Sequence, residues 1–299
     1  RLTLSFYKYS KIKNTFVFRN FLFVHLERLN ILGRIYIASE GINAQLSVPG
    51  SKLIEFKNLI DSISFLNGVR LNIAIEHSNE AFLKLKIKIK EKIVADGLNL
   101  NDYDLDVHGK HVNAEEFNEL LENKNTITID MRNHYESEVG HFKGANLPDV
   151  DTFRESLPLI NNKYKNYKKN KKILMYCTGG IRCEKASAYL LKNGFKNVYQ
   201  LNGGIVEYAR QVKENKIENK FVGKMFVFDN RLGERISNDI ISNCHQCGEK
   251  CDEHTNCNNE ACHLLFIQCE DCKKKYDGCC CKKCNEIYSM PTEKQKEFR

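Results

Sequence analysis

The sequence predicts a mixed α and β chain in three parts: an α+β domain over residues 1–95, an α/β domain over residues 113–220, and a small cysteine-rich region over residues 221–299. Three observations predict this division. Strand-like and helix-like runs follow the order βαββαβ in the first part, they alternate singly in the second, and eleven of the thirteen cysteines lie in 244–284. The polar, irregular residues 96–112 are typical of a linker.

The first part begins with a strand and a helix that Asn14 caps, because an Asn side chain accepts from free N–H groups at a helix start. Gly33 is expected to end this helix, and Ser51 to cap a second one. The order βαββαβ is the split βαβ arrangement of ferredoxin-like and acylphosphatase-like domains. The expected strands cover residues 4–9, 34–38, 44–48 and 69–75, and the second helix covers residues 51–62.

A fifth strand-like run alternates lysines strictly with aliphatic residues. On a strand, the two kinds of side chain face opposite sides. One interpretation is a cationic stripe that follows a phosphate backbone. The other is an edge strand that lysines protect from aggregation. The run alone favours neither, and the RNA-binding candidates are Lys84, Lys86, Lys88 and Lys90.

The second part begins with a capping-box-like pair, Asn113 and Glu116, at the start of a helix. The strand-like and helix-like runs that follow alternate along the chain. This alternation predicts a mainly parallel sheet with ligands at the carboxyl ends of its strands. The lysine-rich segment 161–172 is expected to be a solvated loop. The expected strands cover residues 126–130, 173–176 and 198–200, and the expected helices cover residues 182–192 and 205–213.

The most informative stretch is Cys177-Thr178-Gly179-Gly180-Ile181-Arg182, which lies between a strand-like and a helix-like run. Free N–H groups of such a loop and the positive end of the helix lower the pKa of a thiol and favour the nucleophilic thiolate. Paired glycines let the backbone curl around an anion. We therefore expect Cys177 and Arg182 to be catalytic, with Thr178, Gly179, Gly180 and Ile181 forming the loop.

Cys183 follows directly and has two interpretations. It is either a resolving thiol that attacks an oxidised or persulfurated Cys177, or a small buried residue of the first helical turn. The second is slightly favoured.

Three further motifs agree with this loop: Asp130-Met131-Arg132, Gly140-His141-Phe142-Lys143-Gly144-Ala145, and Leu201-Asn202-Gly203-Gly204. In this order around a loop cysteine, they resemble the rhodanese family over residues 126–215. The resemblance implies that Cys177 carries a persulfide or another covalent intermediate, and that Asp130 and Arg132 brace the loop. Four residues separate Cys177 from Arg182, fewer than in dual-specificity phosphatases, so that activity is disfavoured.

Two longer stretches restrict the resemblance to one group of rhodanese-domain proteins. Upstream is Gly33-Arg34-Ile35-Tyr36-Ile37-Ala38-Ser39-Glu40-Gly41-Ile42-Asn43, and downstream is Phe226-Val227-Phe228-Asp229-Asn230-Arg231 before the cysteines. Together with the loop they resemble the rhodanese-domain tRNA uridine(34) hydroxylases. The resemblance implies a cytoplasmic enzyme that forms 5-hydroxyuridine in tRNA with molecular oxygen as co-substrate. The sequence carries no flavin, haem or two-His-one-carboxylate signature. The alternatives are a persulfide sulfurtransferase and a non-enzymatic adaptor.

The amino-acid composition is compatible with this interpretation. The formal net charge is +8, which suits a polyanionic partner but also a merely solubilising surface. The sequence has no apolar run long enough for a bilayer and no signal-peptide pattern, so no membrane association is expected. In a cytosolic chain, clustered cysteines more often bind metal than form disulfides.

The cysteine-rich region has CxxC pairs, each of which places two thiolates on one tight turn. The sequence predicts structural zinc in two sites. The first is formed by Cys244, Cys247, Cys269 and Cys272, and the second by Cys257, Cys262, Cys280 and Cys284. An iron–sulfur cluster is the competing interpretation, and disulfides are the third.

Overall fold

The structure is a computed structural model that describes residues 1–298. It divides into two compact units. The larger unit holds residues 1–134, 144–219 and 228–231, and the smaller holds residues 135–143, 220–227 and the chain from Leu232 onward. Within residues 1–298, none of the helices combines the length and the apolar character that crossing a membrane requires.

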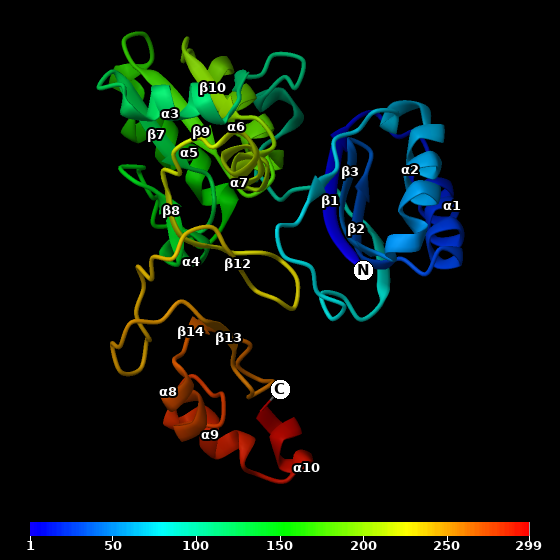
Figure 1. The fold of residues 1–299 in the computed structure, drawn as a ribbon, viewed down its shortest axis with the longest axis vertical. Helices are drawn as coiled ribbons and strands as arrows, with labels where there is room; N and C mark the ends of the chain where they lie inside the picture. The colour runs from blue at the N-terminus through cyan, green and yellow to red at the C-terminus, as the bar shows by residue number, and fades with distance from the viewer. Residues whose placement is uncertain (299) are drawn as a thin grey trace. The chain divides into compact units, whose positions relative to one another are not determined.

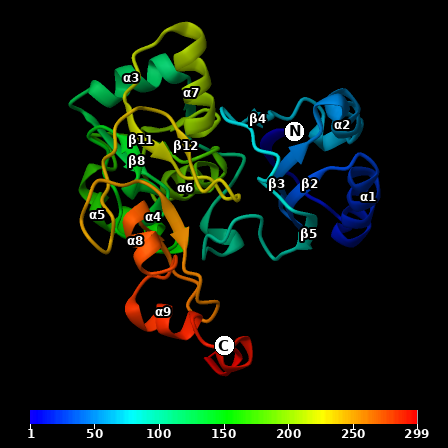
Figure 2. The same ribbon diagram turned by 60° about the horizontal axis from the view of Figure 1, so that its bottom comes forward.

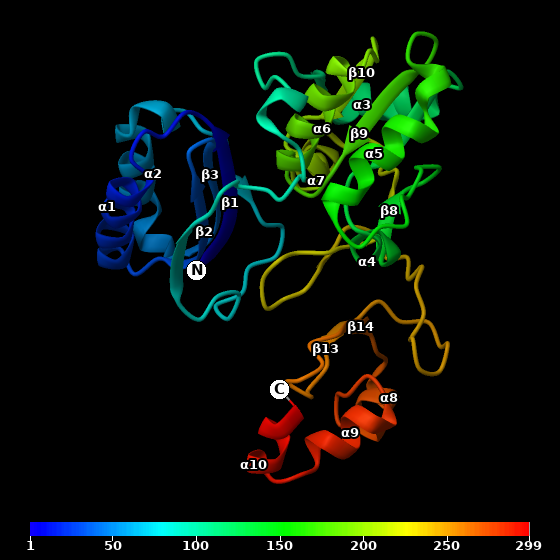
Figure 3. The ribbon, with the colours of Figure 1, turned by 180° about the vertical axis from the view of Figure 1, so that it is seen from behind.

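The N-terminal part of the larger unit is a five-stranded sheet in the order β4-β1-β3-β2-β5. The first four strands have the order of a split βαβ domain, and β5 extends the edge parallel to β2. Both helices cover the same face of the sheet (Figures 1 and 3), where Leu22 and Leu26 of α1 and Phe56 and Ile60 of α2 are buried. The elements are β1 (Leu2–Tyr9), α1 (Thr15–Arg28), β2 (Leu32–Ala38), β3 (Gly41–Val48), α2 (Leu53–Ser62), β4 (Asn72–Ile73) and β5 (Leu85–Ile89).

The helix boundaries were predicted only in part. The Asn14 side chain caps α1 by accepting from the N–H of Val17 at 3.0 Å, as expected. The expectation that Gly33 ends this helix is wrong, because α1 ends at Arg28 and Gly33 lies in β2. There, a Cβ atom would lie 2.2 Å from the carbonyl oxygen of Gln45, so close strand pairing explains the glycine. Ser51 does not cap α2, because it lies in a short 3₁₀ turn that precedes the helix.

The second part of the larger unit is a parallel four-stranded sheet in the order β6-β10-β9-β7. Helices α5 and α6 pack on one face of this sheet (Figure 3). On the other face, Phe117 of α3 contacts Tyr176 of β9 and Tyr208 of α7. The expected α/β domain with a mainly parallel sheet is therefore confirmed, and helices cover both faces of this sheet. The elements are β6 (Lys110–Val112), α3 (Ala114–Glu122), β7 (Thr126–Asp130), α5 (Phe153–Lys163), β9 (Lys172–Tyr176), α6 (Ile181–Lys192), β10 (Val198–Leu201) and α7 (Gly204–Asn215).

Two segments differ from the expectation. Strand β6 forms at the end of the segment expected to be an irregular linker, and it pairs with β10 at the edge of the sheet. Helix α5 was not predicted, and its end together with a 3₁₀ turn at Lys165–Tyr167 replaces much of the loop expected over residues 161–172. Pro158 inside α5 weakens the helix signal in the sequence.

The smaller unit has little apolar core, and cysteines supply much of it. One buried cluster joins Val139 and Ile267 to Cys244, Cys251 and Cys272. Its sheets are β12-β11-β8 and the hairpin β13-β14, and Figure 2 shows the helices that follow. Helix α4 (His134–Glu138) leads into this unit, whose other elements are β8 (Gly140–Phe142), β11 (Phe221–Met225), β12 (Glu234–Arg235), β13 (His254–Asn256), β14 (Leu265–Ile267), α8 (Glu270–Lys275), α9 (Lys282–Tyr288) and α10 (Thr292–Gln295).

Candidate functional site

Cys177 directly follows β9 and begins the turn that leads into α6. Its Sγ atom accepts a hydrogen bond from the N–H of Gly180 at 3.1 Å, which curls the loop around the sulfur. Gly180 has a φ of 101°, a value that glycine adopts without the strain of a side chain. Gly204 at the start of α7 packs so closely that a Cβ atom would lie 2.5 Å from the carbonyl oxygen of Cys177. The two glycines therefore shape the loop that the sequence predicted.

The electrostatics of the loop favour a thiolate at Cys177. Burial opposes ionisation, but the thiol of Cys183, the charge of Arg182 and the backbone N–H groups of both residues outweigh it and lower the pKa of Cys177 to about 6. Burial and the neighbouring Cys177 raise the pKa of Cys183 well above its usual value, so this thiol stays protonated and acts as the donor. The two sulfur groups thus differ in charge although they are neighbours.

Two buried basic residues support the loop. Arg182 is only 7% exposed, lies over the ring of Phe228 at 5.9 Å, and approaches the hydroxyl of Thr178 at 3.5 Å. Arg132 is fully buried and bonds Asp130, with Nη2 and Oδ2 2.6 Å apart. Because Asp130 ends β7, the strand beside β9, this ion pair fixes the strand end next to Cys177. The geometry fits the bracing that we expected of Asp130 and Arg132.

Residues of the N-terminal domain complete the surroundings of the loop. The hydroxyl of Tyr7 donates to Glu184 Oε1 at 3.2 Å, and that of Tyr9 donates to the carbonyl of Ile181 at 3.1 Å. The side chain of Asn72 donates to the carbonyl of Gly179 at 3.4 Å. All three side chains come from adjacent strands, β1 and β4, of the first sheet. Their role was missed because nothing local in the sequence pairs them with residues more than a hundred positions away.

A buried ion cluster joins the same two domains. The fully buried ammonium of Lys185 in α6 bonds both carboxylate oxygens of Glu40 at 2.9 and 2.8 Å and also bonds Asp96. Asp96 accepts a further bond from Lys92 at 2.5 Å. A carboxylate from the turn between β2 and β3 of the first domain and one from the connecting segment therefore neutralise a lysine of the second domain.

A cavity of about 530 Å³ opens beside Cys177 between these domains. Side-chain amides of Asn43, Gln45 and Asn72 line it, together with the rings of Tyr36 and Phe228. Cations also border it: Arg34, Lys90, Lys92, Arg154 and Arg182. The volume lies within the range of about 300–1,000 Å³ that small-ligand sites occupy. The cavity thus offers planar apolar surfaces, amide hydrogen bonds and positive charge next to a thiolate.

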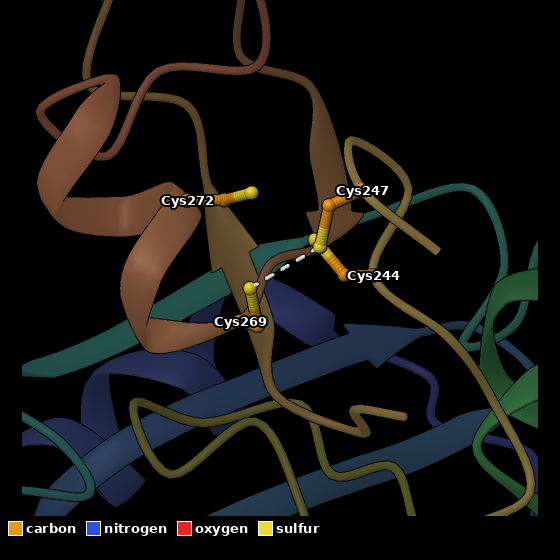
Figure 4. Close-up of side chains that lie close together, drawn as sticks. All are labelled: Cys244, Cys247, Cys269 and Cys272. Atoms are coloured by element: carbon orange, nitrogen blue, oxygen red, sulfur yellow. Dashed lines mark hydrogen bonds between the residues drawn. The ribbon is translucent and has the colours of Figure 1, made fainter. Parts of the chain in front are cut away.

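The first group of predicted metal ligands comes together in the smaller unit. Cys244, Cys247, Cys269 and Cys272 have sulfur atoms that all lie within 4.8 Å of one another (Figure 4). Sulfurs at the corners of a zinc tetrahedron, each about 2.3 Å from the ion, lie about 3.8 Å apart. The Sγ atoms of Cys247 and Cys269 are 3.6 Å apart, so this donor set fits zinc.

The second group also assembles as predicted, from Cys257, Cys262, Cys280 and Cys284. The Sγ atom of Cys280 lies 3.7 Å from that of Cys262 and 3.6 Å from that of Cys284. All thirteen cysteines of the described chain have free thiols. The structure therefore contains two four-thiol clusters that could each hold a metal ion.

Three family models each match one of the three parts of the chain. Residues 1–93 match the family model described as UPF0176 acylphosphatase like domain, and residues 113–211 match that of the Rhodanese-like domain. Residues 222–285 match the model described as Rhodanase C-terminal.

Curated relatives match over the whole chain. The tRNA uridine(34) hydroxylase of Leptospira interrogans serogroup Icterohaemorrhagiae serovar Lai is 54% identical, over 100% of this chain and 81% of the relative. The protein of the same name from Photorhabdus laumondii subsp. laumondii is 51% identical, over 100% of this chain and 85% of the relative. The chain belongs to the tRNA uridine(34) hydroxylase family.

Similarity to solved structures is partial. The rhodanese-like domain protein from Staphylococcus aureus is 27% identical over 33% of this chain and 90% of its own, with a TM-score of 0.27. The full-length relatives show that the chain belongs to the tRNA uridine(34) hydroxylase family.

In this family member the lysine-rich run forms the edge strand β5 and its flanks. Lys84, Lys86, Lys88 and Lys90 are all exposed, and Ile87 between them is buried. Lys90 lines the cavity beside Cys177, with its ammonium 5.8 Å from the ring centre of Tyr36. Both interpretations of the run remain compatible with this geometry, because an edge strand can also carry a cationic stripe.

Proposed function

We propose that this protein hydroxylates carbon 5 of uridine 34 in tRNA, with molecular oxygen as co-substrate and Cys177 as its essential residue. The carrying observation is a cysteine of pKa about 6 beside a cavity of about 530 Å³ lined by amides, rings and cations. The full-length similarity to relatives named tRNA uridine(34) hydroxylase supports the substrate and the reaction. A tRNA substrate implies that the protein acts in the cytoplasm.

The cavity suits an unstacked uracil. Uracil presents two carbonyl acceptors and one N–H donor, and the side-chain amides of the lining residues Asn43 and Gln45 contain both donors and acceptors. One donor of Asn43 already bonds the carbonyl of Ile93 at 3.3 Å. The rings of Tyr36 and Phe228 supply surfaces on which a base can stack. Enzymes that act on a base must first take it out of its stack, which costs least in a single-stranded loop. We therefore place the target base in this cavity.

The chemistry follows from the thiolate. In one route, the Cys177 thiolate adds to carbon 6 of uracil, which makes carbon 5 enolate-like and reactive toward oxygen. In the other, Cys177 is oxidised first and passes oxygen to the base. Arg182, over Phe228 at the cavity, stabilises the negative charge that develops in either route.

The electron balance gives Cys183 a role as the resolving thiol. Replacing the carbon 5 hydrogen by hydroxyl with one oxygen molecule, and releasing one water, consumes two electrons and two protons. Oxidation of the Cys177 thiolate and the neighbouring Cys183 thiol to a disulfide supplies both electrons and one proton, and the second proton comes from water. Their hydrogen bond brings the two sulfur groups into contact. A cellular thiol would then reduce the pair for the next turnover.

We assign binding and stability roles to the remaining candidates. The exposed lysines of the β5 run (84, 86, 88 and 90) contact the tRNA backbone, since they lead to the cavity at Lys90. The two four-cysteine clusters hold structural zinc, because four thiolates close the coordination sphere and leave no position for substrate.

Mass spectrometry of nucleosides in tRNA tests the proposal. Cells that carry only the Cys177→Ser protein should lose 5-hydroxyuridine and its derivatives. Cells that carry the Cys281→Ser protein should keep them, because Cys281 is exposed and lies outside both cysteine clusters. Normal 5-hydroxyuridine in the Cys177→Ser cells would exclude either chemical route.

A persulfide sulfurtransferase is the second candidate, and the N–H donated to the sulfur of Cys177 favours it, because the same loop suits a bound persulfide. The same measurement separates the two. Loss of thiolated nucleosides with normal 5-hydroxyuridine would support sulfur transfer and contradict hydroxylation.

A further inference from the structure

Three potential metal ligands lie close together beside the Cys177 loop. His108 lies just before β6, His111 lies in β6, and Glu184 lies in the first turn of α6. One ligand atom from each lies within 4.8 Å of the others. This group contains no cysteine and belongs to the larger unit, so it is distinct from the two four-cysteine clusters.

The spacing of the donors fits an ion with nearly right-angled coordination. His111 Nε2 and Glu184 Oε1 are 2.8 Å apart. Two ligand atoms at this separation, each about 2.1 Å from an ion, subtend about 85° at that ion. Adjacent ligands of an octahedral ion subtend 90°, whereas a tetrahedral ion requires a wider angle. The pair thus matches two neighbouring positions of an octahedron.

Outer hydrogen bonds hold two of these side chains, His108 and Glu184, in orientations that ligation needs. His108 Nδ1 lies 3.1 Å from the carbonyl of Gly109, which leaves the other ring nitrogen available as an acceptor. Glu184 Oε2 accepts from the amide of Gln200 at 3.1 Å, while Oε1 accepts from Tyr7. Metal-binding histidines typically donate their second N–H to a carbonyl or carboxylate, and ligating carboxylates are themselves hydrogen-bonded.

The group also has access to a small molecule. His108 and Glu184 line a second cavity of about 360 Å³, together with Tyr7, Arg70, Asn202 and Gly179. Gly179 belongs to the Cys177 loop, and it lines the cavity beside Cys177 as well. Three protein ligands would leave coordination positions open toward this space.

We propose that His108, His111 and Glu184 bind one divalent transition-metal ion of the Fe²⁺ or Mn²⁺ class. Two imidazoles and one carboxylate with open positions are the donor set of non-haem iron sites. The ion would replace the proton that now links His111 to Glu184. Metal binding here does not depend on the proposed hydroxylation, so each can fail without the other.

Electron paramagnetic resonance with Mn²⁺ tests the proposal. The full chain first receives two equivalents of Zn²⁺, which thiolates bind in preference to Mn²⁺. We expect it then to bind one Mn²⁺ with nitrogen hyperfine coupling from imidazole. His108→Ala and the nearly isosteric Glu184→Gln should each weaken binding by more than about tenfold.

The control is His25→Ala, because His25 belongs to the last turn of α1 and lies outside the cluster. This variant should bind Mn²⁺ like the parent protein. Circular dichroism melting of each variant separates lost binding from lost folding. Absence of Mn²⁺ binding by the parent protein would overturn the proposal, as would binding that persists in folded His108→Ala protein.

Discussion

Replacing Cys183 separates its two possible contributions to the Cys177 site. The Cys183 thiol donates a hydrogen bond that lowers the pKa of Cys177, and it is also the proposed resolving thiol. Cys183→Ala removes both contributions. Cys183→Ser keeps a hydroxyl donor in nearly the same volume but cannot form a disulfide. The pair of variants therefore distinguishes an electrostatic role from a redox role.

The size of the electrostatic effect follows from the pKa of Cys177, which is lowered from 9.0 to about 6. At pH 7.5 the thiolate of a group with pKa 6 outnumbers the neutral thiol about thirtyfold. For a group with pKa 9, the neutral thiol outnumbers the thiolate by about the same ratio. A hydrogen bond to a charged group contributes about 1.5–3 kcal/mol. Its loss in Cys183→Ala should therefore raise the pKa by about one to two units, while Cys183→Ser should move it less.

The assay is alkylation of Cys177 by a small reagent as a function of pH, read by peptide mass spectrometry. In the parent protein the rate should rise as pH increases through about 6 and then level off. The inflection should move upward in Cys183→Ala. A parent inflection at pH 8 or above, or the same inflection in all three proteins, would refute the electrostatic reasoning. Loss of 5-hydroxyuridine in Cys183→Ser, with a nearly unchanged inflection, would support the redox role.

Three further predictions concern stability and metal content. Lys185→Met should lower the free energy of unfolding by about 3–5 kcal/mol in urea titrations, because it leaves Glu40 without an ion-pair partner and Asp96 with Lys92 alone. Gly204→Ala should destabilise by about 1–3 kcal/mol more than Gly144→Ala, since both glycines have positive φ but only a Cβ at 204 meets backbone atoms; equal effects would contradict the packing argument. Removing metal with a chelator should make residues 244–284 sensitive to limited proteolysis, and Cys247→Ser should reproduce this where Cys281→Ser does not. Unchanged protease resistance after metal removal would count against structural zinc.

The sequence predicted those helices, strands and cysteine clusters that are marked by a local motif, such as a helix cap, a run of apolar residues or a pair of cysteines. Asn113 and Glu116 form both hydrogen bonds of the capping box, and the strand before Cys177 ends where the pattern of apolar residues ends. Both four-cysteine groups assemble as predicted. In the first group, the two CxxC pairs each place two thiols on one tight turn, whereas the second group contains no CxxC pair. Helix α5 was missed because Pro158 and its polar residues obscure the helical pattern.

Contacts between distant residues could not be predicted in this way. Gly33 is explained by its approach to Gln45 across the sheet, not by the helix that precedes it. Tyr7 meets Glu184, and Glu40 meets Lys185, only after two domains have folded and packed. The same reason explains why no two-His-one-carboxylate pattern was visible, since Glu184 lies 73 residues from His111. Rules based on sequence spacing identify metal ligands that lie a few residues apart. They miss ligands that only the tertiary structure brings together.

The contacts of Tyr7, Tyr9 and Asn72 with the Cys177 loop have a consequence for protein engineering. These three side chains, which surround the loop that holds the Cys177 sulfur, lie more than a hundred positions upstream of it in the sequence. A fragment trimmed to the parallel sheet and its helices would retain the reactive group but lose the enclosure that selects what reaches it. Grafting this loop onto another scaffold would transfer nucleophilicity without the accompanying selectivity.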